Sequence, residues 1–224
     1  MLLDRVLGLL SPHYCKGCGR AGSGLCEGCL LDITESPYGR CLGCGTVMMD
    51  GNICRTCRTK LPFDRAYVVG ERRGTLKRLV GDFKFNSERG QARVIIRLLD
   101  AVLPILPDDT VIVPVPTIAP HVRQRGFGHT ELVARLLAKQ RHLRCDSHLL
   151  LRATNTVQHG LKAAERRKQA AKAFTVNQHR RFPAEILLLD DIYTTGATVI
   201  AAAKLLKKAG VQTINLAIVA RQLK

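Results

Sequence analysis

The stretch that decides the fold is ILLLDDIYTTGATV, residues 186–199. Its four leading apolar residues predict a buried strand of a parallel sheet, and Asp190 and Asp191 follow where an open α/β sheet presents its ligands. Carboxylates at that position can accept hydrogen bonds from sugar hydroxyls. The alternative is an ordinary strand, turn and helix with an Asp-capped turn.

A loop rich in hydroxyl groups follows the two acids. It offers side-chain hydroxyls and closely spaced backbone N–H groups just before a predicted helix, whose amino terminus favours an anion. The sequence therefore predicts a cradle for the 5′-phosphate of a sugar, made by Thr194, Thr195, Gly196, Ala197 and Thr198.

The surrounding sequence alternates between strand and helix patterns. Val199, Ala203 and Leu206 recur at helical spacing before Gly210, and residues 214–220 form a further apolar run. Upstream, strands are predicted at 66–70 and 111–116, and helices around residues 76–83, 94–102 and 132–137. We predict an α/β fold with a mostly parallel sheet flanked by helices.

The cysteines predict metal binding in the first part of the chain. Eight of the nine form four CxxC pairs, and in each pair one tight turn can direct both sulfurs at one ion. Two structural zinc sites are expected, and a disulfide framework is the rival interpretation. Short spacers favour two successive ribbons over a cross-braced pairing, with the ligands Cys15, Cys18, Cys26 and Cys29 in one site and Cys41, Cys44, Cys54 and Cys57 in the other.

A change of pattern marks a domain boundary near Leu61-Pro62-Phe63-Asp64. We predict a small double zinc ribbon over residues 1–60 and an α/β domain over residues 61–224. The ninth cysteine, Cys145, has no partner motif and is expected to be an incidental thiol.

The charge is strongly basic and unevenly distributed. The chain carries 35 Lys and Arg against 18 Asp and Glu, and residues 61–224 hold 28 and 13 of these, a formal balance of +15. Such a surface favours phosphate-rich ligands or nucleic acid, or it merely aids solubility. No apolar run reaches membrane-span length and no secretory signal is convincing, so a cytoplasmic location is expected.

A second phosphate site is predicted between the strand at 111–116 and the next helix. Arg123, Arg125 and Gly126 belong to a basic, glycine-containing stretch at the start of that helix. A solvated connection with exposed arginines is the alternative. Residues 151–168, which include His159, are also polar and basic, and we expect either a mobile segment that closes over an anion or a solvated helix.

The ordered set of motifs resembles the ComF family, particularly its GntX-type members. The matching pieces are the CxxC knuckles, Phe83-Lys84-Phe85, Val113-Pro114-Val115-Pro116, Arg125-Gly126-Phe127, Leu151-Arg152, and the final stretch, which is similar to the 5-phosphoribosyl-1-diphosphate (PRPP) signature of type I phosphoribosyltransferases. This sequence departs from the family at Gly128-His129, where Asn-Gln is common, and at Ala170-Ala171-Lys172, where Asn is frequent.

The resemblance implies a zinc ribbon region joined to a type I phosphoribosyltransferase-like domain that acts in the competence-type handling of incoming single-stranded DNA. Asp190 and Asp191 match the ribose-binding acids, and Thr194 to Thr198 match the 5′-phosphate loop. Arg123, Arg125 and Gly126 match the pyrophosphate side, and Mg²⁺ would accompany PRPP.

Two functions remain open from the sequence. The first is a phosphoribosyltransferase with an unknown acceptor, for which no catalytic base can be assigned. The second is a non-catalytic DNA-binding or partner-binding protein that uses the PRPP site as a regulatory pocket. A helicase or another DNA-uptake protein is a possible partner for the ribbons.

Overall fold

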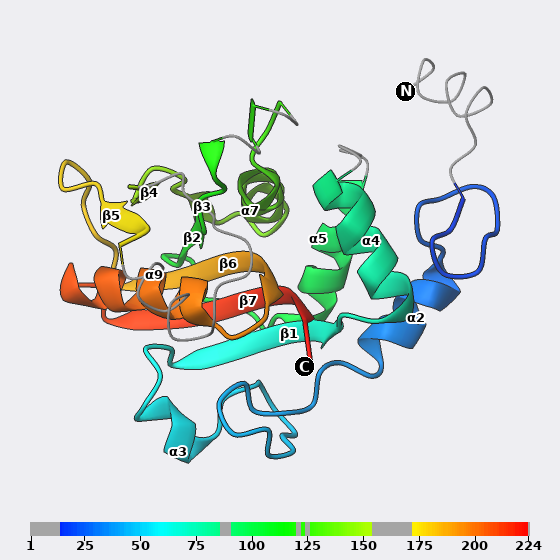
Figure 1. The fold of residues 1–224 in the computed structure, drawn as a ribbon, viewed down its shortest axis with the longest axis horizontal. Helices are drawn as coiled ribbons and strands as arrows, with labels where there is room; N and C mark the ends of the chain where they lie inside the picture. Colours follow the sequence, from blue (N-terminus) through cyan, green and yellow to red (C-terminus); the bar gives the residue numbers. More distant parts are fainter. Residues whose placement is uncertain (1–13, 86–90, 120–121, 124–125, 154–171, 224) are drawn as a thin grey trace.

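The computed structural model describes residues 14–85, 91–119, 122–123, 126–153 and 172–223. Its centre is a five-stranded sheet in which every neighbouring pair of strands is parallel (Figure 1). The strands, in spatial order, are β1 (Arg65–Glu71), β7 (Thr213–Arg221), β6 (Glu185–Tyr193), β2 (Val111–Pro114) and β3 (Arg144–Cys145).

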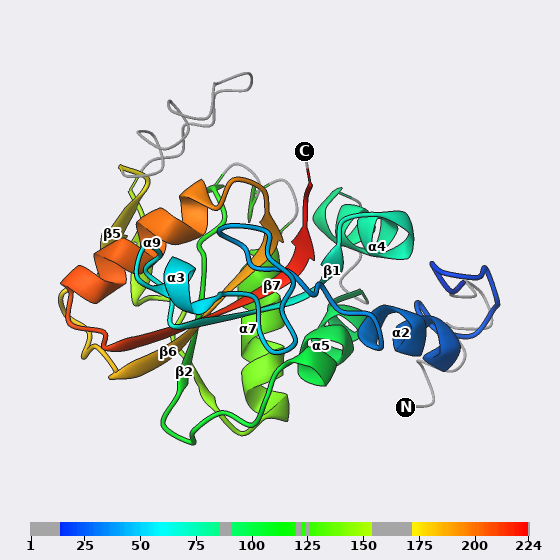
Figure 2. The same cartoon turned by 90° about the horizontal axis from the view of Figure 1, so that it is seen from below.

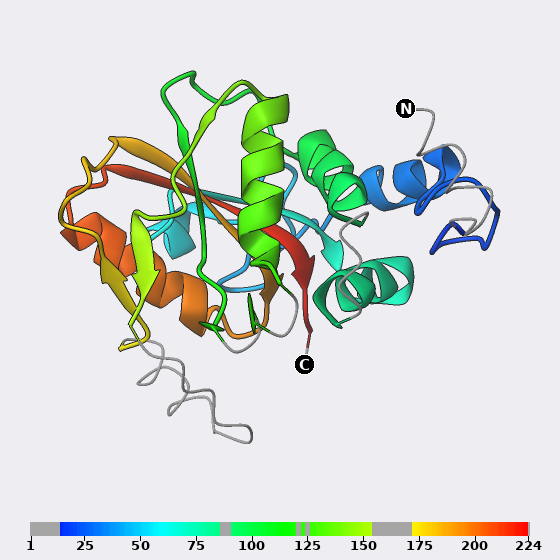
Figure 3. The same ribbon diagram turned by 90° about the horizontal axis from the view of Figure 1, so that it is seen from above.

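Helices cover both faces of the sheet. Figure 3 shows one face, covered by α4 (Gly74–Phe85), α5 (Gln91–Val102) and α7 (His129–Gln140). Figure 2 shows the other face, covered by α9 (Ala197–Lys208). A small antiparallel pair, β4 (Leu150–Arg152) and β5 (Phe174–Val176), packs beside α9. The predicted α/β architecture is therefore confirmed.

The apolar residues of β6 alternate between two separate hydrophobic cores. Leu187 and Leu189 belong to the cluster that includes α4, α5 and α7, whereas Ile186 and Leu188 belong to the cluster that includes α9. This division follows from the period of two along a strand. All four are less than 2% exposed, as expected for a central parallel strand.

The cysteine-rich segment lies along β1, the edge strand of the sheet. Its first half, with α2 (Glu27–Thr34), joins the α4–α5 core through Cys15, Leu25 and Leu30. Its second half, with α3 (Arg55–Arg58), joins the α9 core through residues that include Cys41 and Cys57. The two halves thus join the cores on opposite faces of the sheet, and Figures 1 and 2 show α2 and α3 well apart.

Asn52 closes the outer edge of β1. Its backbone N–H donates to the carbonyl of Ala66 at 2.7 Å, and its side-chain Oδ1 accepts from the N–H of Val68 at 2.8 Å. These bonds satisfy backbone groups that an edge strand would otherwise present to another chain.

The order of the strands creates a switch point between β2 and β6. From β2 the chain passes through α7 to β3 on one side, and from β6 it passes through α9 to β7 on the other. Ligands of open α/β sheets bind in the crevice beyond the carboxyl ends of such strands. In the described part of the chain, no helix has the length and hydropathy that a membrane crossing requires.

Candidate functional site

The two acids sit on β6 just where its neighbour β2 stops. The sequence predicted them at the carboxyl end of the apolar strand, and β6 continues through both to Tyr193. The ladder with β2 ends at Pro114, which pairs with Leu189, followed by one bond from the N–H of Val115 to the carbonyl of Leu189. Pro116 has no N–H to continue the ladder, so the edge of β6 is open at the acid pair.

Asp191 faces α7, where a histidine holds its carboxylate. The Nε2 atom of His129 lies 2.7 Å from Oδ2 of Asp191, and both residues are buried. The other ring nitrogen, Nδ1, lies 3.3 Å from the hydroxyl of Thr117. Both ring nitrogens of His129 therefore lie close to polar groups, Nε2 to the Asp191 carboxylate and Nδ1 to the Thr117 hydroxyl. The result is a chain of contacts from hydroxyl to imidazole to carboxylate.

Packing fixes the position of the His129 ring. The ring of Phe83 on α4 meets it edge-on, with centroids 6.1 Å apart. Beside it, the hydroxyl of Thr130 donates to the carbonyl of Val115 at 2.7 Å and ties α7 to the end of β2. The orientation of Asp191 is therefore set by residues from three different elements.

Asp190 faces the opposite side of the strand, toward the β4–β5 pair. Arg152 of β4 lines the same pocket, and its guanidinium lies over the ring of Phe174 at 5.1 Å. Burial lowers the pKa of Arg152 below its ordinary value, and the negative charge of Asp190 opposes that shift. Arg152 therefore places a positive charge in the pocket that the two carboxylates line.

Together these groups line a pocket of about 280 Å³ at the carboxyl edge of the sheet. Four predicted site residues line it: Asp190, Asp191, Thr194 and Thr198. Four further lining residues were not predicted from the sequence: Thr117, His129, Thr130 and Arg152. The one local signal for His129 was the departure from the family at Gly128-His129. The other three could not be predicted, because side chains from four separate segments meet only in the folded chain.

The predicted phosphate loop forms the tight turn from β6 into α9. Gly196 is its pivot, with φ of 75°, and a Cβ at this position would meet the side chain of Tyr193. The N–H of Ala197 donates to the hydroxyl of Thr195 at 3.4 Å. Behind the loop, Arg221 donates to the carbonyls of Tyr193 and Thr194 and lies over the Tyr193 ring at 4.8 Å. These contacts hold the amino end of α9 next to the acid pair.

The predicted pyrophosphate side is described only in part. Arg123 is exposed, and Gly126 has φ of 77° in the connection before α7, but neither lines the pocket. Arg125 and the segment 154–171, which includes His159, lie outside the described residues. The assignment of a second phosphate group to this side stays a prediction.

The cysteines form two compact groups of four. Cys15, Cys18, Cys26 and Cys29 form one and Cys41, Cys44, Cys54 and Cys57 the other, with the sulfurs of each group within 4.8 Å of one another. A tetrahedral zinc ion bound at about 2.3 Å separates its sulfurs by about 3.8 Å. The contacts Cys15–Cys26 at 3.6 Å and Cys44–Cys54 at 3.7 Å match that value.

All the described cysteines are free thiols, so the disulfide interpretation is not supported and the pairing is by successive ribbons. Each group has the donor set of a structural zinc site, with four thiol ligands and no open position. We conclude that both groups can bind zinc.

Backbone N–H groups surround the buried sulfurs. Burial by itself would raise the pKa of the Cys15 thiol, but N–H donors from Cys26, Cys18 and Gly17 outweigh it and lower the pKa to about 6. Hydrogen bonds with Thr46 likewise lower the pKa of Cys44 to about 6. In the same two groups the pKa is raised to about 12 for Cys29, chiefly by the Cys26 side chain, and for Cys57, chiefly by burial. Thiolate is the form that binds a metal.

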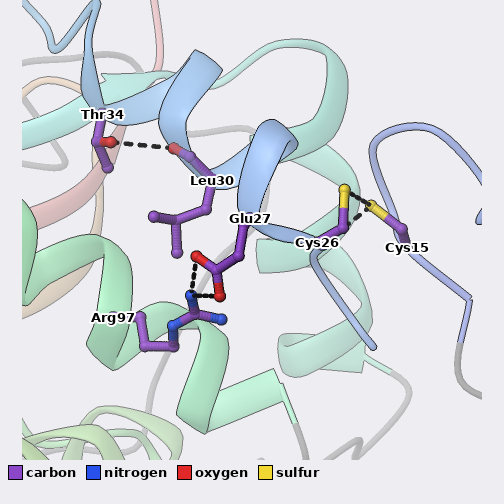
Figure 4. A network of polar contacts seen from close by, with 6 residues as sticks. All are labelled: Cys15, Cys26, Glu27, Leu30, Thr34 and Arg97. Atoms are coloured by element: carbon purple, nitrogen blue, oxygen red, sulfur yellow. Dashed lines mark hydrogen bonds and ion pairs between the residues drawn. The ribbon is translucent and has the colours of Figure 1, made fainter. Parts of the chain in front are cut away.

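Figure 4 shows how the first ribbon is fastened to the helices. Arg97 on α5 contacts both carboxylate oxygens of Glu27 on α2, at 2.5 and 2.6 Å. Nearer the knuckle, Arg78 on α4 donates to the carbonyl of Lys16 at 2.8 Å, and Lys16 pairs with Asp82 at 2.7 Å. The first ribbon is thus bonded to two helices.

Cys145, at the end of β3, lies apart from both clusters. Burial raises the pKa of its thiol to about 11. The thiol is therefore protonated near neutral pH and is a poor nucleophile, which agrees with an incidental residue.

Comparison with known proteins gives matches along nearly the whole chain. The chain is 31% identical to competence protein F of Haemophilus influenzae, over 91% of this chain and 93% of that protein. It is 29% identical to the DNA utilization protein YhgH of Escherichia coli, over 90% of this chain and 87% of that protein. It is 28% identical to competence protein ComFC of Bacillus subtilis, over 83% of this chain and 79% of that protein. No protein-family model matches the chain.

Proposed function

This chain belongs to the ComF family of competence and DNA utilisation proteins, and from that premise we propose that it binds PRPP and acts in the handling of incoming single-stranded DNA. The observation that carries the first half is the acid pair at the switch point, next to the amino end of α9. The names of the relatives support the second half.

The pocket suits a phosphorylated ribose. Carboxylates at the floor, Asp190 and Asp191, would accept hydrogen bonds from the ribose hydroxyls. The N–H groups and hydroxyls of residues 194–198 would hold the 5′-phosphate, which the amino end of α9 favours. Arg152 adds a positive charge beside the sugar, and the basic connection at Arg123, Arg125 and Gly126 would face the pyrophosphate.

If transfer occurs, the acceptor displaces pyrophosphate at the anomeric carbon of the ribose. This chain's part in that step would be to hold the sugar in position and to offset developing charge with the carboxylates and the phosphate-binding N–H groups. We assign no catalytic base, because the imidazole of His129 is buried between Thr117 and Asp191.

Metal ions fit both parts of the proposal. Mg²⁺ prefers hard oxygen ligands and substrate phosphates, and the Asp190 and Asp191 carboxylates offer such oxygens at the pocket. When bound, Mg²⁺ would neutralise pyrophosphate charge. Zinc would stabilise the two ribbons. A reducing, cytoplasmic location suits eight cysteines kept as zinc ligands.

Binding to DNA would rely on the basic residues of the α/β part together with the ribbons. A helicase or another DNA-uptake protein is the proposed partner. The expected signature is a linear fall of log affinity with log salt, at a slope of about −0.7 per phosphate neutralised. The division into a ribbon region, 1–60, and an α/β domain, 61–224, belongs to the same proposal.

Calorimetry with PRPP and Mg²⁺ tests the pocket. We expect the isosteric double variant Asp190→Asn, Asp191→Asn to fold and to lose at least about tenfold in affinity, or 1.4 kcal/mol. The exposed variant Lys204→Gln on α9 is the control and should bind as the wild type does. Equal affinity in the double variant would reject the site.

A second measurement separates enzyme from binding protein. Pyrophosphate release is followed with PRPP and candidate acceptors, single-stranded DNA among them. Release that depends on an acceptor and is lost in the double variant identifies a transferase. Tight PRPP binding without release supports the alternative, a regulatory pocket in a protein that binds DNA or a partner.

A further inference from the structure

A second cavity lies at the opposite edge of the sheet, where the strands begin. It measures about 990 Å³, and its floor includes Val111 at the start of β2, Ala184 just before β6 and Gln212 just before β7. Along β6 it is separated from the acid pair by six residues, or about 20 Å at roughly 3.3 Å per residue. It is therefore a separate site from the pocket described above.

Four arginines line this cavity, from three parts of the fold. They are Arg135 on α7, Arg144 on β3, and Arg180 and Arg181 in the loop before β6. All four are exposed. Two carboxylates, Asp109 and Asp146, also line it, which leaves an excess of positive charge. We call this cavity, with its four arginines, the arginine cleft.

The arginines differ in how much of their hydrogen-bonding capacity is used. Arg135 is occupied, since it contacts Glu131 at 2.7 Å and Ser147 at 2.8 Å. Arg144 makes one long contact, 3.5 Å to the carbonyl of Asp109, and Arg180 lies 3.8 Å from Asp146. Among the described residues, no group within hydrogen-bonding or ion-pairing distance is found for Arg181.

A guanidinium offers five N–H donors in a planar fork that matches a phosphate. Arg144, Arg180 and Arg181 therefore retain most of their donors for a ligand. Because they are exposed and come from different elements, they suit a chain of phosphates better than one buried anion. Phe182, half-buried, lines the same cleft and can supply an aromatic surface for a base.

We propose that the arginine cleft binds the phosphate backbone of single-stranded DNA, at a site that is separate from the PRPP pocket. This inference rests on the proposed role in DNA handling and gives that role a place on the molecule. Because the two sites occupy opposite edges of the sheet, DNA and PRPP can be bound at the same time.

The test compares two triple variants of the full chain that lose the same charge. The cleft variant is Arg144→Gln, Arg180→Gln, Arg181→Gln, and the control is Lys77→Gln, Arg93→Gln, Lys204→Gln. The control positions are exposed on α4, α5 and α9, outside the cleft. Affinity for a fluorescent oligothymidylate of about 20 nucleotides, longer than usual single-strand sites, is measured by anisotropy at several salt concentrations.

We expect the cleft variant to bind the oligothymidylate at least about tenfold more weakly. The slope of log affinity against log salt should become shallower by about 2, because three phosphate contacts contribute roughly 0.7 each. The control should keep its slope, and saturating PRPP should not displace the DNA. The single reversal Arg181→Glu, at a side chain without partners among the described residues, should also weaken binding and provides a readout if the triple variant misfolds.

Each other outcome is decisive. Equal losses of DNA affinity in the cleft and control variants would overturn the assignment of DNA binding to the cleft, while leaving the role in DNA handling intact. Tighter binding of an RNA oligomer than of DNA, or displacement by PRPP, would also overturn it. If the wild type binds no single-stranded DNA even at low salt, the proposed function itself fails.

Discussion

Asp190 and Asp191 are adjacent in sequence but have different surroundings, because the pleat of β6 directs them to opposite faces. Asp191 meets His129 on the α7 side, and Asp190 lies toward Arg152 on the β4 side. The carboxylate of Asp191 thus lies against a buried imidazole. Because this contact restricts the orientation of the carboxylate, we infer that His129 is a positioning residue for the pair.

Substituting His129 separates positioning from simple packing. Gln can still donate to Asp191, so we expect His129→Gln to keep PRPP affinity within about threefold. His129→Leu fills the space without a donor and should lose about tenfold in affinity, 1.4 kcal/mol, and about 1–3 kcal/mol of stability.

Calorimetry with PRPP, alongside urea unfolding, measures both effects of the His129 variants. The positioning role of His129 is rejected if His129→Gln and His129→Leu weaken PRPP binding equally while both variants stay folded.

At the level of elements, the sequence predicted most of what the structure contains. The apolar runs at 186–189 and 214–220 and the helical spacing after Gly196 identified β6, β7 and α9, because local patterns set these elements. The spacing of the CxxC pairs identified both cysteine groups. Each of these motifs is contiguous, so its chemistry can be predicted from the sequence alone.

The contacts that complete the pocket could not be predicted in this way. His129 and Arg152 reach the acids only because β2 ends at Pro114 and because α7 and β4 lie on opposite faces of the sheet. Likewise, nothing local in the sequence around Asn52 shows that it pairs with β1. Such contacts depend on strand order, which no single segment encodes.

The turn between β6 and α9 provides a test at this scale. Gly196→Ala places a side chain in left-handed backbone, which costs about 1–2 kcal/mol, and its Cβ meets buried Tyr193. We expect a lower melting temperature and weaker PRPP binding.

Gly210→Ala, beyond the other end of α9, is the control for the Gly196 variant, because Gly210 has φ of 109° and nothing lies within 4 Å of an added Cβ. It should lower stability by about 1–2 kcal/mol and leave PRPP affinity nearly unchanged. A Gly196→Ala variant with normal stability and affinity would show that the turn adapts and does not preform the phosphate loop.

For the whole molecule, the ribbons are more than an attachment to the sheet. The two cysteine groups repeat the same local structure. Gly19 and Gly45 have φ of 77° and 76°, and the N–H of each donates to the carbonyl of the first cysteine of its group at 2.9 Å. One repeat packs into each hydrophobic core, and Asn52 covers the edge of β1 between them. Their loss would open both cores and the sheet edge together.

This arrangement predicts how zinc contributes to stability. We expect about two zinc ions per chain in freshly purified, reduced protein, from two complete sets of four ligands. Removing them with a chelator should lower the temperature of a single cooperative unfolding transition, because Cys15 and Cys41 belong to the cores of the α/β part. Scanning calorimetry with and without chelator measures this.

The substitution Cys18→Ser, at an exposed ligand of the first site, should reproduce about half of the zinc loss and shift the same transition. Two separate transitions, with the second insensitive to chelator, would mean that residues 1–60 fold independently of the sheet. Stoichiometric disulfides with no bound metal would instead reject the zinc sites themselves. A single shifted transition would mean that the ribbons and the α/β part unfold together, because both contribute residues to the same two cores.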